Sequence, residues 1–114
     1  MKMIIATVKP HKFDQVTAAL IKSDVLGLTT CEVRGFGRER KDSTEISRGI
    51  AYRTKLKPMV LMMVSVTDEL VEPVKKIIAE TANTGEISSG KIFVLNLEDV
   101  LRIRTGETGE TALL

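Results

Sequence analysis

The sequence is poor in the residues that most often build metal centres and catalytic sites. Its 114 residues include one cysteine, Cys31, and one histidine, His11. A single cysteine excludes an internal disulfide and a cysteine-cluster zinc site, and a single histidine argues against a histidine-based metal centre. We find no Ser/His/Asp or Cys/His set and no paired carboxylates on one helix face, so the sequence argues against an enzyme. We expect Cys31 to be buried in a strand and His11 to be exposed at the start of a helix.

Aromatic residues and long apolar runs are also scarce. Aromatics make up 4% of the chain, and Phe93 has no aromatic neighbour in its strand, so no stacking platform for nucleic acid is visible. No run approaches the roughly 18 apolar residues of a membrane span, and the apolar stretch that follows Met1 is too short for a signal peptide. We therefore expect a cytoplasmic protein with no nucleic-acid partner and no direct membrane insertion.

What the chain has instead is a long basic segment in its middle. The polar stretch from Gly37 to Pro58 separates two apolar runs. Loops longer than about 12–15 residues are uncommon in compact domains, and they are usually functional or disordered. Residues 37–57 hold seven basic and three acidic side chains, a net charge of +4, whereas the rest of the chain carries −2. A solvated loop of mixed charge is the plainer interpretation; the functional one is an arm that touches an anionic ligand or an acidic partner.

Hydrophobic periodicity predicts an α+β fold in one domain that spans residues 1–114. Apolar or alternating runs predict strands over residues 3–9, 28–34, 59–66 and 91–97, with a short C-terminal strand over 101–104. Apolar residues at helical spacing predict helices over 11–22 and from Asp68 onward. Pro73 requires the second helix to start late or to kink, because proline is tolerated only in the first turn. This order of elements is that of the ferredoxin-like βαββαβ sandwich, with the long loop between strands 2 and 3.

The predicted packing leaves one face of the sheet uncovered. The strand over 59–66 is apolar on both faces and should be central, with Met59, Met62 and Met63 in the core. Helices cover one face of such a sheet, and no element remains for the other. Because large exposed apolar patches are rare on monomers, we expect the protein to self-associate through this face.

Three short segments suit an anionic ligand. GFGR, residues 35–38, combines an arginine with glycines that let a backbone approach a ligand closely. TGEISSGK, residues 84–91, is a turn whose N–H groups could form an anion-binding nest beside Lys91, although it lacks the GxxxxGK[ST] spacing of a P-loop. Arg102 and Arg104 would lie about 7 Å apart on one face of the last strand. Each signal is weak alone, because most glycine-rich turns are only turns and most arginines on an edge strand are solvated.

The sequence resembles the PII signal-transduction family over essentially its whole length. The motifs that carry the resemblance are TVKP (7–10), EVRGFGR (32–38), TEISRGIAY (44–52), TGEISSGKIFV (84–94) and RIRTGETG (102–109). The resemblance implies a homotrimer of ferredoxin-like subunits that binds ATP or ADP in the clefts between subunits. Glu86, Ser88 and Ser89 depart from the residues usual in the family's TGEISSGK loop, and this leaves room for ADP or AMP. It also implies that residues 37–58 are the family's flexible T-loop, which contacts a target enzyme, transporter or transcription regulator. The nucleotide-binding residues that it implies are Thr29, Gly35, Gly37, Arg38, Ser89, Gly90, Lys91, Arg102 and Arg104.

Departures from the family pattern affect its small effector, 2-oxoglutarate. Glu39 replaces the glutamine that helps to hold Mg²⁺ and 2-oxoglutarate; a carboxylate could still bind Mg²⁺, but it repels a dianion. Met59 replaces the lysine that follows the T-loop's closing proline, and we expect Lys57 to point to the other face of the extended chain. The sequence therefore predicts weak or absent 2-oxoglutarate binding. Tyr52 aligns with a tyrosine that some members have uridylylated, so it is a candidate site of modification or partner contact.

Several functions remain open at this point. The first is a regulator that senses adenine nucleotides and controls a target protein through its T-loop. A regulator of a membrane transporter with a different small effector is an alternative. The basic loop also permits a nucleic-acid-binding ferredoxin-like domain, although aromatics are few. A small nucleotide hydrolase is the last alternative, and the lack of an evident general base argues against it.

Overall fold

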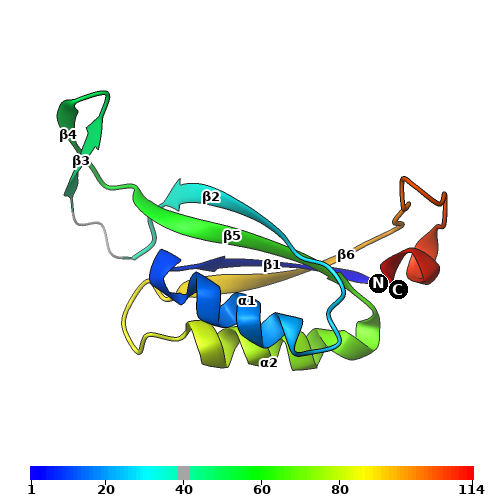
Figure 1. The fold of residues 1–114 in the computed structure, drawn as a ribbon. Helices are drawn as coiled ribbons and strands as arrows, with labels where there is room; N and C mark the ends of the chain where they lie inside the picture. Colours follow the sequence, from blue (N-terminus) through cyan, green and yellow to red (C-terminus); the bar gives the residue numbers. More distant parts are fainter. Residues whose placement is uncertain (39–41) are drawn as a thin grey trace.

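Four antiparallel strands form the main sheet of the protein, in the order β2-β5-β1-β6 (Figure 1). The computed structural model describes residues 1–38 and 42–114. The strands are β1 (Lys2–Val8), β2 (Thr29–Gly35), β5 (Lys57–Val66) and β6 (Gly90–Asn96). β5 pairs with β2 on one side and β1 on the other, so the expected central strand is confirmed.

Two helices pack against each other on one face of this sheet (Figure 1). α1 (Phe13–Ile21) follows the 3₁₀ turn η1 (Pro10–Lys12), and α2 (Val71–Ala82) follows the 3₁₀ turn η2 (Asp68–Leu70). Pro73 falls in the first turn of α2, where its missing N–H costs no helical hydrogen bond, so the late start of this helix is confirmed. His11 is exposed at the start of the first helical segment, as expected. Neither helix of residues 1–38 and 42–114 is long and apolar enough to cross a membrane.

The order β1-α1-β2-β5-α2-β6 confirms the ferredoxin-like α+β fold. Its core lies between the helices and the sheet, because alternate strand residues point to opposite faces. The most completely buried side chains come from both layers: Ile4, Val8, Met62 and Val64 from the strands, and Val16, Leu20, Val74 and Ile78 from the helices.

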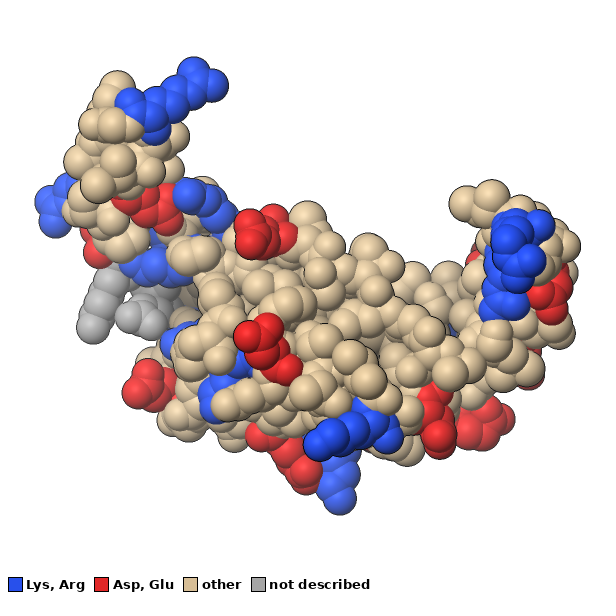
Figure 2. All heavy atoms as spheres, in the orientation of Figure 1, with Lys and Arg blue, Asp and Glu red and all other residues tan. Residues whose placement is uncertain are grey.

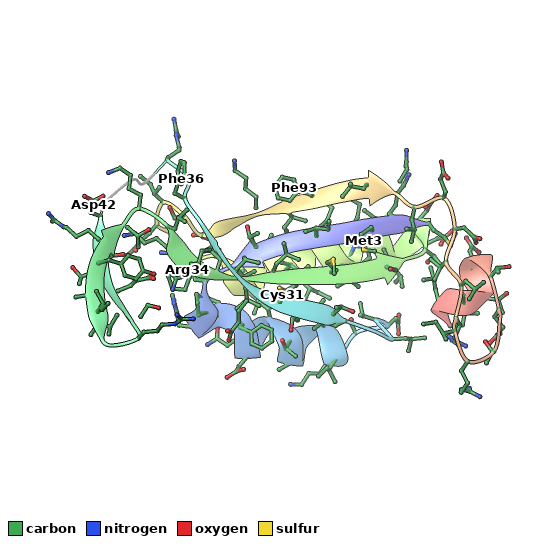
Figure 3. All side chains as sticks on the ribbon, turned by 90° about the horizontal axis from the view of Figure 1, so that it is seen from above. Met3, Cys31, Arg34, Phe36, Asp42 and Phe93 are labelled. Atoms are coloured by element: carbon green, nitrogen blue, oxygen red, sulfur yellow. The ribbon has the colours of Figure 1, made fainter. Side chains whose placement is uncertain are left out.

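The opposite face of the sheet is apolar and carries no helix (Figure 3). Met59 and Met63 lie on it and are only half-buried, so of the three methionines expected in the core, Met62 alone is there. Phe93 is 48% exposed on the same face. The expectation that Cys31 is buried is wrong. β2 is an edge strand, and the Cys31 thiol is exposed on the face of the sheet that carries no helix.

A two-stranded hairpin occupies most of the segment for which the sequence predicted a long loop. β3 (Ser43–Ser47) and β4 (Ile50–Thr54) pair with each other and form a sheet of their own. Arg48 and Gly49 between them have φ values of 53° and 78°, and two consecutive positive φ values are typical of a type I′ hairpin turn. The loop also closes earlier than predicted, because β5 already begins at Lys57. The hairpin projects from one end of the molecule (Figure 1).

Residues 101–104 do not form the predicted C-terminal strand. Leu101 makes an isolated bridge to Thr108, and the chain turns between them. The Gly106 N–H donates to the Arg102 carbonyl at 2.8 Å, and Gly106 adopts a φ of 74°. Glycine adopts such a positive φ at no steric cost, so a tight turn replaces the strand here. The 3₁₀ turn η3 (Gly109–Leu113) follows.

Candidate functional site

The starts and ends of the main strands place two of the predicted anion-binding segments at the same end of the sheet. β2 ends at Gly35, opposite the first residue of β5, and β6 begins at Gly90, opposite the last residue of β1. GFGR and TGEISSGK therefore lie at one end, on the two outer strands. Three strand spacings separate these strands, a distance of about 14 Å.

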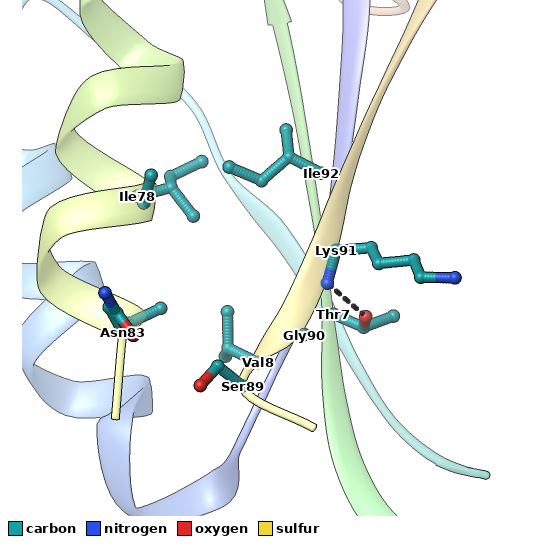
Figure 4. A pocket seen from close by; sticks show the side chains of 10 residues that line it. Thr7, Val8, Ile78, Asn83, Ser89, Gly90, Lys91 and Ile92 are labelled. Atoms are coloured by element: carbon teal, nitrogen blue, oxygen red, sulfur yellow. Dashed lines mark hydrogen bonds between the residues drawn. The ribbon is translucent and has the colours of Figure 1, made fainter. Parts of the chain in front are cut away.

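Gly90 marks the closest approach between β6 and β1. Its φ is 117°, and a Cβ at this position would come 1.8 Å from the Thr7 carbonyl oxygen. The next residue, Lys91, donates its backbone N–H to the Thr7 hydroxyl at 3.3 Å (Figure 4). This tight junction turns the Lys91 side chain outward, away from the neighbouring pocket (Figure 4). Glycine is therefore required at position 90 by sterics as well as by φ.

That pocket, of about 340 Å³, lies between the end of α2 and the first residues of β6. Apolar side chains such as Val8, Ile78 and Ile92 line it, with Asn83 and Ser89 at its margin (Figure 4). The Lys91 ammonium points elsewhere, so the pocket lacks the positive charge that a phosphate would need. Ser89, Gly90 and Lys91 border this pocket, but the charged end of Lys91 lies outside it.

Residues 83–89 use several of their polar groups within the loop. The Ser89 hydroxyl pairs with the Thr84 hydroxyl at 2.7 Å and donates to the Glu86 carbonyl at 2.9 Å. The N–H groups of Gly85 and Glu86 donate to the Asn83 and Thr84 side chains at 2.8 and 3.3 Å. A phosphate would have to compete with these bonds, so the loop as it stands is only partly the open nest that the sequence predicted.

GFGR leaves β2 as an exposed strand end. A Cβ added at Gly35 or at Gly37 would meet no atom within 4 Å, so a ligand could approach this backbone closely. Arg38 is exposed beside it. Glu39, the candidate Mg²⁺ ligand, lies outside the described residues. Among residues 1–38 and 42–114 there is no cluster of three or more metal-ligating side chains.

The remaining predicted site residues lie toward the opposite end of the sheet. Thr29 is the first residue of β2, and Arg102 and Arg104 follow β6 beyond its last residue. A strand of seven residues spans about 20 Å, so one copy of the chain does not bring these three residues to Lys91. Basic side chains lie on the hairpin and at the C-terminal end, and acidic and other basic side chains lie between these two ends (Figure 2).

Arg102 holds the C-terminal turn rather than sharing a strand face with Arg104. Its Nη1 donates to Glu107 Oε1 at 2.9 Å, and its Nη2 donates to the Ala112 carbonyl at 3.0 Å and to the Leu114 carbonyl. The predicted arginine pair on one strand face is therefore wrong, since the strand is absent. Arg104 is exposed. Glu107 was not predicted from the sequence to interact with Arg102. The turn between Leu101 and Thr108 brings it beside Arg102, where its carboxylate accepts a hydrogen bond from the guanidinium.

Tyr52 belongs to a polar cluster that the sequence analysis also missed. Tyr52 on β4 lies directly opposite Glu45 on β3, and its hydroxyl donates to Glu45 Oε2 at 3.0 Å. Arg34 of β2 donates from Nη1 to the Tyr52 hydroxyl at 3.0 Å and also pairs with Glu45 Oε2. The pairing of Glu45 with Tyr52 could have been predicted if a hairpin had been assumed. The contact of Arg34 with this pair could not, because it depends on how the hairpin lies against β2.

Two lysines follow β4 at the base of the hairpin. The Lys55 ammonium donates to Asp42 Oδ1 at 2.7 Å, and this hydrogen bond lowers the pKa of the carboxyl below its ordinary value. The alternation of β5 places Lys57 on the same face as Met59, because they are two residues apart. The expectation that Lys57 points to the other face is therefore wrong.

Comparisons with known proteins decide the family. The family model for nitrogen regulatory protein P-II matches residues 1–107. The chain belongs to the PII family. Nitrogen regulatory protein P-II of Pasteurella multocida is 49% identical over 113 residues, which are 99% of this chain and 100% of the relative. The corresponding protein of Rhizobium etli is 44% identical, and nitrogen regulatory protein GlnK of Escherichia coli is 42% identical, both over the same shares.

PII proteins are signalling regulators and not enzymes. They bind nucleotides, and they act as trimers that regulate target proteins. Membership in this family agrees with the scarcity of catalytic residue sets in the sequence, and it makes the two separated basic ends the natural place to look for a ligand.

Proposed function

We propose that this PII protein binds ATP, ADP or AMP between copies of the chain and controls a target protein through the arm formed by residues 37–58. In this proposal residues 1–114 act as one domain. The observation that carries the proposal is the division of the site residues between the two ends of the sheet. Gly35, Gly37, Arg38, Ser89, Gly90 and Lys91 lie at one end, and Thr29, Arg102 and Arg104 lie toward the other. A second copy is needed to bring the two groups to one phosphate chain.

The uncovered face of the sheet supports a homotrimer as the assembly. Half-buried Met59 and Met63 of β5 and exposed Phe93 and Leu95 of β6 give this face an apolar surface. Burying such a surface is favourable by about 25 cal/mol for each Å² removed from water. In the trimer the C-terminal end of one copy would meet the GFGR end of its neighbour, and Arg104 and Lys91 would then face one ligand.

The hairpin is the part of the arm that we assign to the target protein. Ile46 and Ile50 near its tip are 76% and 69% exposed, and Arg48 occupies the turn between them. Two apolar side chains and a guanidinium on a projecting hairpin can enter a cleft in another protein. We place this activity in the cytoplasm, with neither insertion into a membrane nor a nucleic-acid partner.

Calorimetric titration with ATP, ADP and AMP in the presence of Mg²⁺ tests the proposal. Lys91→Ala should lower the nucleotide affinity about tenfold or more, because charge-assisted hydrogen bonds contribute roughly 1.5–3 kcal/mol. Lys76→Ala is the matched control, since this lysine lies on α2 beside Glu80 and is 75% exposed. Absence of binding by all three nucleotides, or equal losses in both variants, would contradict the proposal.

A further inference from the structure

The orientation of the hairpin depends on few contacts with the rest of the molecule. β3 and β4 form a two-stranded sheet separate from the main sheet, and the hairpin stands clear of the helices and of the C-terminal turn (Figures 1 and 2). Two-stranded hairpins are marginally stable by themselves in water. Interactions at the base of the hairpin therefore decide where it points.

Arg34, Glu45 and Tyr52 make such an interaction, because they join β2 of the main sheet to both strands of the hairpin. The tyrosine hydroxyl accepts from Arg34 Nη1 and donates to Glu45 Oε2, each at 3.0 Å, and Arg34 also pairs with the carboxylate. The three groups thus form a closed cycle in which the hydroxyl both donates and accepts. The Glu45 side chain is only 17% exposed, whereas Arg34 is 48% exposed.

We propose that Arg34, Glu45 and Tyr52 form a latch that holds the hairpin against β2 and occupies the Tyr52 hydroxyl. With the latch closed, the hairpin keeps the orientation seen here. With the latch open, the hairpin turns away from β2 as a unit. The Tyr52 side chain, already 40% exposed, keeps its bond to Glu45 within the hairpin, but its oxygen loses the Arg34 donor and so becomes more reactive toward reagents and partners. The latch does not depend on nucleotide binding, so a result that contradicts one of the two proposals leaves the other unaffected.

Charge and burial make this latch easy to open. Hydrogen bonds to charged groups are stronger than neutral ones, yet ion pairs with an exposed member contribute little net free energy. The closed and open states should therefore differ by a small free energy, which a bound ligand or partner can reverse.

Tyr52 is the only tyrosine of the chain, so a reagent that modifies tyrosine hydroxyls reports on the latch alone. The rate at which N-acetylimidazole acetylates this hydroxyl, followed by mass spectrometry on the full chain, reports how often the latch is open. We expect Arg34→Ala and Glu45→Ala each to raise this rate about fivefold. Arg53→Ala is the matched control, since Arg53 lies on the hairpin but points to the face opposite Tyr52, and its rate should stay that of the unaltered protein.

The double variant Arg34→Ala/Glu45→Ala separates a latch from two independent effects. If the two residues act through one closed cycle, the double variant should react about as fast as each single variant. Rates that multiply in the double variant, or single variants that react like the unaltered protein, would overturn the proposal. Amide exchange within β3 and β4 should accelerate less than acetylation does in Arg34→Ala. Exchange that accelerates as much as acetylation would mean that the hairpin had unfolded instead of turning, and would also overturn it.

Discussion

Gly90 is the residue whose replacement should be most damaging for a defined steric reason. A Cβ here would lie 1.8 Å from the Thr7 carbonyl oxygen, and the φ of 117° is unfavourable for every other residue. We expect Gly90→Ala to destabilise the protein by about 3 kcal/mol or more in urea unfolding. Gly27→Ala is the control, because a Cβ there meets no atom within 4 Å. Similar losses in the two variants would show that the close approach of β6 to β1 is not what requires glycine.

Replacing Thr17 by valine should stabilise the protein. Its hydroxyl oxygen on α1 is buried and has no hydrogen-bond partner among the described residues. Thr17→Val keeps the shape and removes the unpaired polar atom, so we expect a gain of about 1 kcal/mol. Thr81→Val is the comparison, because that hydroxyl donates to the Ile77 carbonyl at 2.6 Å and its removal should bring no gain. The prediction fails if Thr17→Val lowers the midpoint of urea unfolding.

Single residues were predictable from the sequence where local chemistry decides them. Pro73 could be placed in a first turn without a structure, whereas the close approach of β6 to β1 that requires glycine at position 90 was not predicted. The partners of Arg34 and Arg102 were not predictable, because each depends on a turn or hairpin whose existence was itself missed. The exposure of Cys31 was missed for another reason: the alternation of a strand does not tell which of its two faces the helices cover, and Cys31 lies on the uncovered face.

The hairpin should respond to pH through the ion pair at its base. The hydrogen bond from Lys55 holds the pKa of Asp42 below its ordinary value of 3.8. A carboxyl whose pKa is lowered by folding stabilises the folded form above its unfolded pKa and loses that contribution as the pH falls through its folded pKa. We therefore expect amide exchange in β3 and β4, corrected for the intrinsic rate, to accelerate below about pH 4. Asp42→Asn should remove most of this acceleration, and an unchanged pH profile in that variant would contradict the assignment.

At the scale of elements, the βαββαβ order was predictable because strand and helix periods are strong signals in apolar segments. The hairpin was missed because its strands have only five residues each, because β3 is mostly polar, and because arginine rarely occupies a positive φ, as Arg48 does. The last strand was predicted wrongly, since the alternation in LRIR looks extended while Gly106 and Gly109 allow the chain to turn. The two glycines that follow LRIR were the sequence feature that pointed to a turn. They had more influence on the structure than the alternation of apolar and basic residues before them.

At the scale of the whole molecule, the effector prediction depends on which charges surround the ligand. The family resemblance implies glutamine at position 39, where Glu39 adds a negative charge, and lysine at position 59, where Met59 supplies none, although Lys57 shares the face of Met59. We expect 2-oxoglutarate to bind with millimolar or weaker affinity in the presence of MgATP, measured by calorimetry. Lys57→Ala then tests whether this lysine provides any residual binding. Micromolar affinity would contradict the prediction.

Our proposal requires that two copies of the chain complete each nucleotide site. Lys91→Ala and Arg104→Ala chains, co-expressed with different affinity tags and purified as mixed oligomers, test it most directly by calorimetric titration with nucleotide. Each variant alone should bind weakly, because every site lacks one cation. If Lys91 and Arg104 come from different copies, mixed oligomers contain some sites with both residues intact, and we predict that binding at unaltered affinity returns at those sites. Mixed oligomers that bind no better than either variant would contradict the account, because the site would then lie within one chain.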